Sequence, residues 1–519
     1  MKDKYDVVVI GAGIGGLSAA ALTAMNGKSV LVVDQRPSPG GVCHSFEREG
    51  YIFDVGPHLL SGCGPNGVVT KHLTDLGVID SVEFLDINPL ANLRLPDFNV
   101  EVPPDTNGFI ENLSKLFPET RSGVEMLFRE MQQTYEEMGD LPSTFSLWEF
   151  LKVPVTHPVF MKYPSQTYDT MAEDFVRDEK VNAAISGLWS YFGIPPSKMS
   201  ALFWAAVMMG YLNDGGHIAK GGSGKLGEAY VKGLNKHGGE FLPNHQVEEI
   251  IVENGEAVGV RLKSVQGRWD EVGKHIGNEK DEDTFSVMAD AVVSNADALT
   301  TFEGMLPSGS VSEKFINKLK TQEETPSLFK ISLGVKMELP DDMRYHDTVI
   351  YDSYDMDEVF KKMKEAVPDA PVDITIPSLT DSSLAPEGGH VIHLWNYAPY
   401  MGGDSWESMA NDAADKMIRS TEKYLPGLSD SIEVKLIMTP ASIQRYALTK
   451  NGAPYGWTFS PGQMGINRLQ PRTPIKNLLL AGHWTTPGAG IAGVAMSGEN
   501  TATILLNETN KRYFWRKSA

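Results

Sequence analysis

The segment Tyr5–Gln35 constrains the fold more than any other part of this chain. An apolar run at Val7–Ile10 predicts a strand buried on both faces, and the glycines after it have the spacing G-x-G-x-x-G. A helix rich in small residues follows, and then a second β-rich run, Ser29–Val33, which ends on Asp34. This order of strand, glycine turn, helix, strand and acid predicts a dinucleotide site in a Rossmann-type α/β fold.

Each member of the motif has a physical role at such a site. Gly11 permits a tight turn, Gly13 lets the backbone approach a pyrophosphate, and Gly16 allows the helix to pack close to the strand. The positive helix end faces the phosphates, and Asp34 accepts hydrogen bonds from the ribose hydroxyls. An acid rather than a base at position 34 fits FAD or NAD and argues against a 2′-phosphate.

Composition narrows the classes of partner. The chain has 519 residues with 46 basic and 67 acidic side chains, and its net charge of −21 disfavours nucleic acid. Cys43 and Cys63 are its two cysteines, so we expect no disulfide framework and no metal site. We find neither a signal peptide nor a transmembrane helix, and we expect a cytoplasmic protein.

The C-terminal segment Lys511–Lys517 departs from this acidic composition. Its aromatic residues lie between basic ones, a pattern that suits the headgroup boundary of a membrane. A frayed helix end with favourable dipole charges is the alternative explanation. Peripheral contact with a membrane through this tail therefore stays an open hypothesis.

The chain alternates between two predicted domains. We expect a discontinuous dinucleotide-binding domain from residues 1–104, 216–305 and 441–519, the last of which includes the C-terminal tail. Residues 105–215 have helical character, and residues 306–440 mix helices and strands. These two segments would form a mixed α+β substrate domain.

Shorter patterns predict individual elements. Ser45–Val55 has the pattern of a hairpin, and Asn254-Gly255 between two β-rich runs is a strong hairpin signal. Residues 266–284 are polar and charged, which predicts an exposed hairpin tip.

Two further segments admit a structural and a functional explanation. Ala201–Leu212 is nearly all apolar, so it is either a buried core helix or a wall of an apolar substrate cavity. The run Lys220–Lys225, KGGSGK, superficially suggests a phosphate loop. It lacks the P-loop spacing and a buried strand before it, so we expect no triphosphate site there.

A second glycine-lined segment occurs near the end of the chain. Leu478–Ala481 predicts a buried strand that Gly482 ends, and Gly488, Gly490 and Gly493 lead into a helix of small residues. A large two-ended cofactor needs a second helix N-terminus of this kind. Its dipole can face the electron-rich end of a flavin and stabilise negative charge there.

These motifs, in this order and spacing, resemble the flavoprotein family that contains bacterial-type phytoene desaturases, carotenoid isomerases and retinol saturases. The resemblance covers nearly the whole chain. It is carried by VVVIGAGIGGLSAA, Arg36…Gly40-Gly41, Phe53–Gly56, Lys220–Gly224 with the helix and strand pair after it, Leu384–Gly389, and Leu480–Gly493.

The resemblance implies a non-covalent FAD, an apolar tunnel beside the flavin ring, and chemistry on the carbon–carbon bonds of long isoprenoids. Asp34 stands where many relatives have glutamate, and Val247 matches a backbone contact to adenine. The positions that match the family's FAD contacts are Gly11, Gly13, Gly16, Asp34, Arg36, Gly41, Val247, Gly482, Gly488, Gly493 and Val494.

We therefore expect an FAD-dependent oxidoreductase of the CH–CH class, a desaturase or saturase that transfers a hydride to or from flavin N5. An apolar polyene can be held by buried area alone, at about 25 cal/mol per Å². His58, after the Phe53–Gly56 motif, and His483, after Gly482, are the candidates for proton transfer, although either can be structural. Because we find no second complete GxGxxG, we expect a quinone or oxygen as electron acceptor.

Three alternatives stay open. The chain can be a redox-neutral carotenoid cis–trans isomerase on reduced FAD, or a protein that retains FAD and binds lipid without turnover. It can also be a flavin amine oxidase with an aromatic cage around the amine. The residues available for such a cage are Trp395, Tyr397, Tyr400, Tyr455 and Trp457.

Overall fold

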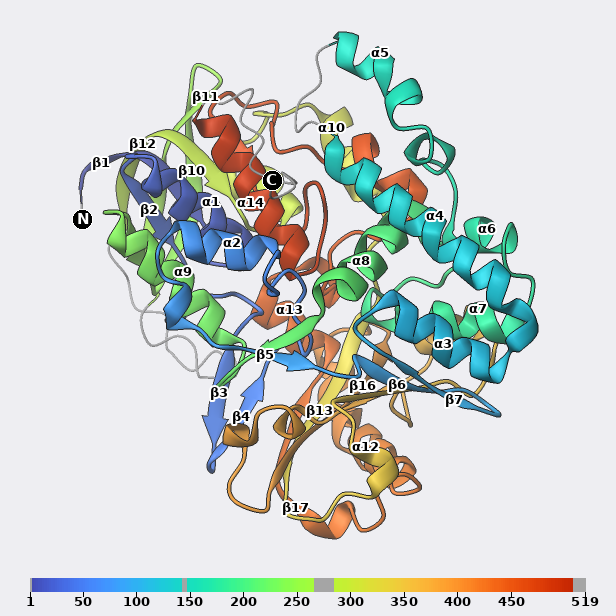
Figure 1. Cartoon of the computed structure of the whole chain (residues 1–519). Coiled ribbons are helices and arrows are strands. Elements are labelled where there is room, and N and C mark those ends of the chain that lie inside the picture. Colours follow the sequence, from blue (N-terminus) through green and yellow to red (C-terminus); the bar gives the residue numbers. More distant parts are fainter. Residues whose placement is uncertain (1, 142–146, 266–283, 507–519) are drawn as a thin grey trace.

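The computed structural model describes residues 2–141, 147–265 and 284–506 (Figure 1). Two predictions fall mainly or wholly outside these ranges: the exposed tip at residues 266–284, of which only the last residue is described, and the membrane contact of Lys511–Lys517. In the described part of the chain, no helix combines the length and apolar character needed to cross a bilayer.

The first of two large sheets contains the N-terminal fingerprint. Its strand order is β10-β11-β12-β1-β2-β9, and β18 pairs with β12 off this path. β1 is parallel to β2 and β12, while β10, β11 and β12 run antiparallel. The strands are β1 (Lys4–Ile10), β2 (Val30–Val33), β9 (Glu240–Leu242), β10 (His245–Glu253), β11 (Glu256–Ser264), β12 (Thr284–Ser294) and β18 (Leu478–Leu480).

The apolar run in β1 is continuous because both faces of this sheet are covered. Val7 and Val9 pack into the core beneath the helices, whereas Val8 and Ile10 pack into the core on the opposite face. The helices on the first face, drawn together in Figure 1, are α1 (Ile14–Met25), α2 (Val68–Asp75), α9 (Gly224–Lys236) and α14 (Ile491–Leu505). The predicted Rossmann-type arrangement is confirmed.

The second large sheet belongs to the predicted substrate domain, called the substrate lobe below. Its order is β17-β13-β16-β15-β14-β6-β7, with β14 parallel to β6 and the other neighbours antiparallel. β6 and β7 come from within residues 1–104, so the first segment of the chain contributes to both sheets. The strands are β6 (Ala91–Arg94), β7 (Asn99–Val102), β13 (Ser327–Val335), β14 (Asp347–Ile350), β15 (Asp373–Thr375), β16 (His390–Ala398) and β17 (Ile432–Met438).

Helices cover this second sheet on both sides. α12 (Gly403–Thr421) packs Trp406 against Phe329 with ring centroids 5.4 Å apart. Most helices of the segment 105–215 pack with residues of β6, β7, β14 and β16 in one large apolar core. The helices that contribute to this core are α3 (Thr106–Leu116), α4 (Arg121–Asp140), α6 (Tyr168–Glu173), α7 (Glu179–Ile185), α8 (Ala201–Asp214) and α11 (Met356–Glu365). α5 (Leu147–Thr156) lies between α4 and α6 in the sequence.

The nearly all-apolar segment Ala201–Leu212 forms most of α8, and most of its side chains are buried. Phe203 stacks on Phe459 at 4.0 Å, and Trp204 packs against Tyr168 at 5.4 Å. The core-helix explanation is therefore confirmed, and a contribution of α8 to a substrate cavity stays a prediction.

Two short strand pairs lie between the sheets. β3 (Ser45–Arg48) and β4 (Tyr51–Asp54) form the predicted hairpin, and β5 (Phe84–Ile87) pairs with β8 (Gly216–Ala219). Tyr51 donates a hydrogen bond of 2.6 Å to Glu433, which lies in β17 of the second sheet. The hairpin predicted at Asn254-Gly255 joins β10 to β11, with both turn residues at positive φ.

Candidate functional site

The fingerprint forms a cradle that excludes side chains. Gly11 has φ +93°, and a Cβ on Gly16 would lie 2.3 Å from the Gly11 carbonyl oxygen. Gly41 approaches closely from the next loop, where its Cβ would lie 3.1 Å from the Gly13 Cα. Gly13 is the N-cap of α1 and has no side chain to satisfy the first N–H groups of the helix. The cradle therefore fits a phosphate-bearing ligand.

Asp34 lies at the end of β2, held by backbone donors. Its two carboxylate oxygens accept hydrogen bonds from the N–H groups of Ala12 at 2.7 Å and Arg36 at 2.8 Å. Burial raises the pKa of Asp34, and these two donors oppose the rise. The acid is thus fixed beside the glycine turn, where a ribose hydroxyl can reach its remaining lone pairs.

Arg36 connects this region to the C-terminal part of the chain. Its guanidinium lies 3.6 Å from the ring centroid of Tyr446 and donates to the carbonyl oxygen of Arg445 at 3.3 Å. Tyr446, in α13 (Pro440–Ala447), in turn donates to the Gly41 carbonyl at 3.2 Å. Val247 is buried in β10, two residues after His245, whose N–H bonds to the Asp34 carbonyl. These predicted contacts therefore gather around one end of the cradle.

The second glycine segment meets the first across the sheet. Gly482 has φ +92°, and a Cβ there would lie 2.3 Å from Asn295 Oδ1. Gly490 is the N-cap of α14, so this helix also begins without a capping side chain, and Gly488 precedes it at φ +134°. Gly493 and Val494 lie inside the first turn, where the Val494 N–H bonds to the Gly490 carbonyl at 2.9 Å. The segment that leads into α14 thus contacts the glycine turn at α1, and both helices begin without a capping side chain.

The third glycine-rich helix start is already occupied by the protein itself. Asp54 Oδ1 accepts hydrogen bonds from the Ser223 N–H and hydroxyl, both at 2.8 Å, and from the Ser45 hydroxyl at 2.6 Å. The Gly224 N–H donates to Ser45 Oγ at 2.9 Å. The N-terminus of α9 thus holds a carboxylate from β4, which accounts for the KGGSGK run without a phosphate.

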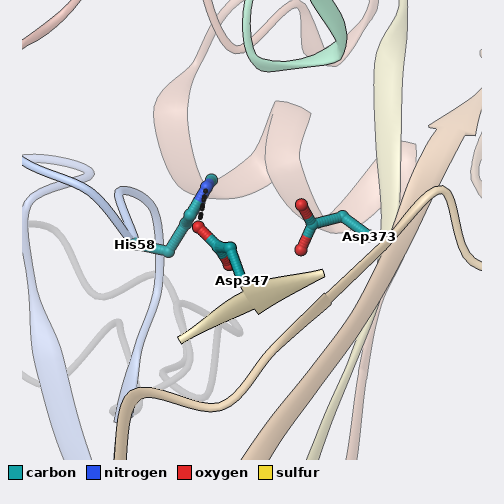
Figure 2. A group of neighbouring side chains, drawn as sticks. All are labelled: His58, Asp347 and Asp373. Carbon is teal, nitrogen blue, oxygen red and sulfur yellow. Dashed lines mark ion pairs between the residues drawn. The ribbon is translucent and has the colours of Figure 1, made fainter. Parts of the chain in front are cut away.

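His58 lies in a buried polar group on the second sheet (Figure 2). Its Nε2 is 3.3 Å from Asp347 Oδ2, and its ring meets Tyr191 edge to face at 4.8 Å. One donor atom from each of His58, Asp347 and Asp373 lies within 4.8 Å of the others. Burial, helped by the charges of His346 and Lys330, lowers the pKa of His58 to about 3, so the imidazole is neutral at pH 7.

His483 has different surroundings. Its ring packs against Trp484 at 4.9 Å, and its carbonyl accepts a hydrogen bond of 2.6 Å from Arg468. Burial and the Arg468 charge lower the pKa of His483 to about 3. None of the contacts described for His483 involves the partners described for His58, so the two candidates belong to separate environments.

The aromatic residues available for an amine cage separate only in part. Trp395 and Tyr397 meet at right angles with centroids 5.8 Å apart, and the Tyr397 hydroxyl interacts with Tyr455. Trp457 instead packs on Trp484 at 5.2 Å, and the Tyr400 hydroxyl donates to Gln444. Three of the five rings therefore lie together, and two have other partners.

Several residues of the site were missed in the sequence. Asp347 and Asp373 are fully buried, and Lys330 is 6% exposed, although each is a charged residue. Asp373 in PVDITIP and Lys330 in SLFKISLGV are single charges inside apolar β-rich runs, a signal that the sequence offered. Asn295, which follows β12, fills the space among Gly11, Gly13 and Gly482.

Comparison with known proteins is consistent with this geometry. A family model described as an NAD(P)-binding Rossmann-like domain matches residues 9–76. The chain is 29% identical to a chloroplastic prolycopene isomerase of Daucus carota, covering 95% of this chain and 79% of that one. It is 28% identical to a neurosporene-forming phytoene desaturase of Cereibacter sphaeroides, with 97% and 95% covered. It is 25% identical to an all-trans-retinol 13,14-reductase of Danio rerio, with 98% and 87% covered.

Solved structures extend the fold to the full chain. A putrescine oxidase bound to putrescine has a TM-score of 0.61 at 14% identity, covering 97% of this chain and 99% of that one. Both sheets are therefore part of one shared architecture. Motif order, the glycine cradle and the relatives agree, and over nearly its whole length the chain is similar to phytoene desaturases, carotenoid isomerases and retinol reductases.

Proposed function

We propose that the protein acts on the carbon–carbon bonds of a long apolar isoprenoid or carotenoid-like polyene, as a desaturase or a saturase. The observation that carries the proposal is the contact between two glycine segments, each of which leads into a helix with an uncapped N-terminus, α1 or α14, at a cradle where glycines leave no room for side chains. FAD, when bound, supplies the acceptance or donation of a hydride.

The chain's own residues fit the two ends of this cofactor. Gly11, Gly13 and Gly16 would hold the pyrophosphate, and the carboxylate of Asp34 would bind the ribose. The first turn of α14 has no capping side chain at Gly490, so the N–H groups of Ile491–Gly493 are available to favour negative charge at the flavin end. Arg36, Gly41, Val247, Gly482 and Gly488 complete the proposed set.

A polyene substrate is supported by the relatives, which are named for prolycopene, phytoene and retinol. The substrate lobe offers apolar area rather than ionic contacts, with Phe192, Phe203 and Phe459 packed in one aromatic group. At about 25 cal/mol per Å² of buried apolar surface, such a lobe can bind a hydrocarbon chain without a charged partner.

His58 is our first choice for the proton that accompanies hydride transfer, because it contacts a buried carboxyl group and an aromatic wall. His483 is the second candidate. Replacing His58 by glutamine should lower turnover by about 100-fold or more, while the same change at His483 should lower it far less. Equal losses at both positions would remove the preference for His58.

The direct test begins with the purified protein. Its visible absorption should show a flavin, and mass spectrometry should identify a co-purifying apolar lipid. Incubation with phytoene, lycopene isomers and retinol should change one product mass by two hydrogens. The desaturation arm contains a quinone or oxygen as acceptor, and the saturation arm is anaerobic with a reductant. A colourless protein that FAD does not reconstitute would overturn the proposal.

A redox-neutral cis–trans isomerase on reduced FAD is the second candidate, since the carrot relative is a prolycopene isomerase. Supplying reductant without a terminal acceptor separates the two activities. An isomerase would turn over with unchanged product mass. Release of hydrogen peroxide on addition of putrescine would instead favour an amine oxidase. The support for that class is the similarity in fold to putrescine oxidase.

A further inference from the structure

The carboxyl groups of Asp347 and Asp373 lie on one face of the second sheet. In the antiparallel ladder of β14 and β15, Asp347 is opposite Thr375 and Asp373 is opposite Val349. The two acids are therefore diagonal neighbours whose side chains project to the same side. Figure 2 shows the Asp373 carboxyl group directed toward Asp347 and His58.

Half of the oxygens in this pair are satisfied, and half are not. Asp347 Oδ2 accepts from the Tyr191 hydroxyl at 3.0 Å, and Asp373 Oδ1 accepts from the Thr375 hydroxyl at 2.8 Å. Asp347 Oδ1 and Asp373 Oδ2 are buried and have no hydrogen-bond partner among the described residues. A proton on one carboxyl group would give the pair the donor that it lacks.

Charge balance favours a single proton. Both acids are 0% exposed, and ionising both would bury two negative charges at a cost of several kcal/mol each. Lys330 is the nearby buried cation, and its ammonium donates to the carbonyls of Asp54 at 2.8 Å and Val55 at 3.4 Å. One proton leaves the pair with one negative charge, which this lysine offsets. Burial raises the pKa of both acids, and the charge of Asp373 raises that of Asp347 further, whereas hydrogen bonds from Thr375 and Asp347 oppose the rise at Asp373.

A divalent cation fits the group less well than a proton does. His58, Asp347 and Asp373 supply one close donor atom each, and the Asp347 oxygen nearest His58 already accepts from Tyr191. A cation would also face the charge of Lys330. His58 has the one side chain of the three with accessible surface, at 16%, so it is the route from the pair to a bound ligand.

We propose that Asp347 and Asp373 share one proton at neutral pH, and that His58 relays this proton between the pair and the carbon chain. This inference rests on the proposed function. When a C–C bond becomes C=C, one hydrogen leaves as a hydride, taken up by an oxidant of the flavin class. The other leaves as a proton, which His58 passes to the ionised carboxylate. Saturation reverses both transfers.

Other titratable groups face the pair from the elements around it. Tyr191, Tyr211, Tyr351 and Tyr455 have pKa values raised by burial, and His58 is neutral. His346 and His393 face His58 and Lys330, and burial lowers the pKa of both. Lys330 is the exception, because burial lowers its pKa to about 8, so it loses charge just above neutral pH.

An infrared experiment on the purified holoenzyme tests the shared proton without substrate. The spectrum of the wild type minus that of the double variant D347N/D373N, at pH 7, should contain one protonated carboxyl band and one carboxylate band. The control is D290N, which alters an exposed partner of Lys4. The spectrum of the wild type minus that of D290N should contain no protonated carboxyl band, because both proteins keep the Asp347–Asp373 pair. Two carboxylate bands together with a bound metal in elemental analysis would assign a cation site. Two protonated bands, or none, would also overturn sharing.

Tyr191→Phe is the milder variant if the double variant does not fold. It removes a donor that stabilises the charged form of Asp347, so the protonated band should persist to higher pH than in the wild type. An unchanged titration of that band would contradict the assignment.

Turnover tests the relay. The double variant should retain its flavin and lose at least about 100-fold in polyene turnover. If flavin binding and infrared bands match expectation while turnover is unchanged, the relay is wrong and the proposed function stands. If the wild type itself turns over no polyene, the proposed function and the relay fall together, and the infrared result still decides the shared proton.

Discussion

Gly15 and Gly482 lie so close together that a Cβ on Gly15 would come within 2.7 Å of the Gly482 Cα. Gly15 is in the first turn of α1, and Gly482 follows β18 near the other end of the chain. Further along the same helix pair, a Cβ on Gly498 would lie 2.4 Å from the Gly15 carbonyl oxygen. The two ends of the chain thus meet through backbone contact.

Gly15→Ala should lower the free energy of unfolding by about 2 kcal/mol or more, because backbone must move to admit the methyl group. The flavin content should fall with it. Gly210→Ala is the matched control, since a Cβ at this position in α8 meets nothing within 4 Å. That variant should be more stable by about 0.5–1 kcal/mol in chemical denaturation, from helix propensity. A Gly15→Ala variant with the same free energy of unfolding as the wild type would contradict the close packing.

Arg36→Lys should destabilise the protein although it keeps the charge. The flat guanidinium stacks on Tyr446 at 3.6 Å, and an ammonium cannot reproduce that stacking and the bond to the Arg445 carbonyl together. We expect a loss of about 1–2 kcal/mol in urea unfolding. Tyr446→Phe, which keeps the ring and removes only its bond to Gly41, should cost less. A lysine variant as stable as the wild type would show that stacking contributes nothing.

Asp54→Ala should lower the free energy of unfolding by roughly 3–5 kcal/mol, because three donors from Ser45 and Ser223 lose their acceptor at once. The comparison is Glu83→Ala, which breaks an exposed pair with Lys220 and should cost less than about 1 kcal/mol. Chemical denaturation of the two variants side by side checks the difference. Similar costs would mean that the α9 N-terminus does not depend on Asp54.

His346 should make the protein less stable in acid. It is 5% exposed, its Nε2 donates to the His58 carbonyl at 2.9 Å, and burial lowers its pKa to about 4. Below pH 6.5 the unfolded chain binds a proton that the folded one refuses, so stability falls as pH drops from about 6.5 to 4.

The measurement compares the wild type with His346→Gln, which keeps a donor for that carbonyl. Relative to this variant, the wild type should lose up to about 1.4 kcal/mol per pH unit across this window. Above pH 7 the difference should be constant. Parallel stability curves down to pH 4 would show that His346 is protonated in the folded state.

The sequence predicted the cofactor half of the site much better than the polar group. The glycines, Asp34 and the first helix are consecutive, so their spacing alone places them at one sheet end. Asp347 and Asp373 become neighbours only when β14 and β15 pair, and no local spacing encodes that ladder. The motif before it made His58 a candidate, whereas the Asp347 carboxyl group 3.3 Å from its Nε2 is evident only in the folded structure.

Each of the two large sheets combines strands that lie far apart in the sequence, and this has a consequence for synthesis of the chain. β1 and β2 emerge from the ribosome before β12 and β18, and their sheet stays incomplete until those later strands have been made. β6 and β7 must likewise wait for β14. Neither lobe can close early, so the nascent polypeptide carries open sheet edges through most of translation, a state that exposes it to aggregation and to chaperones.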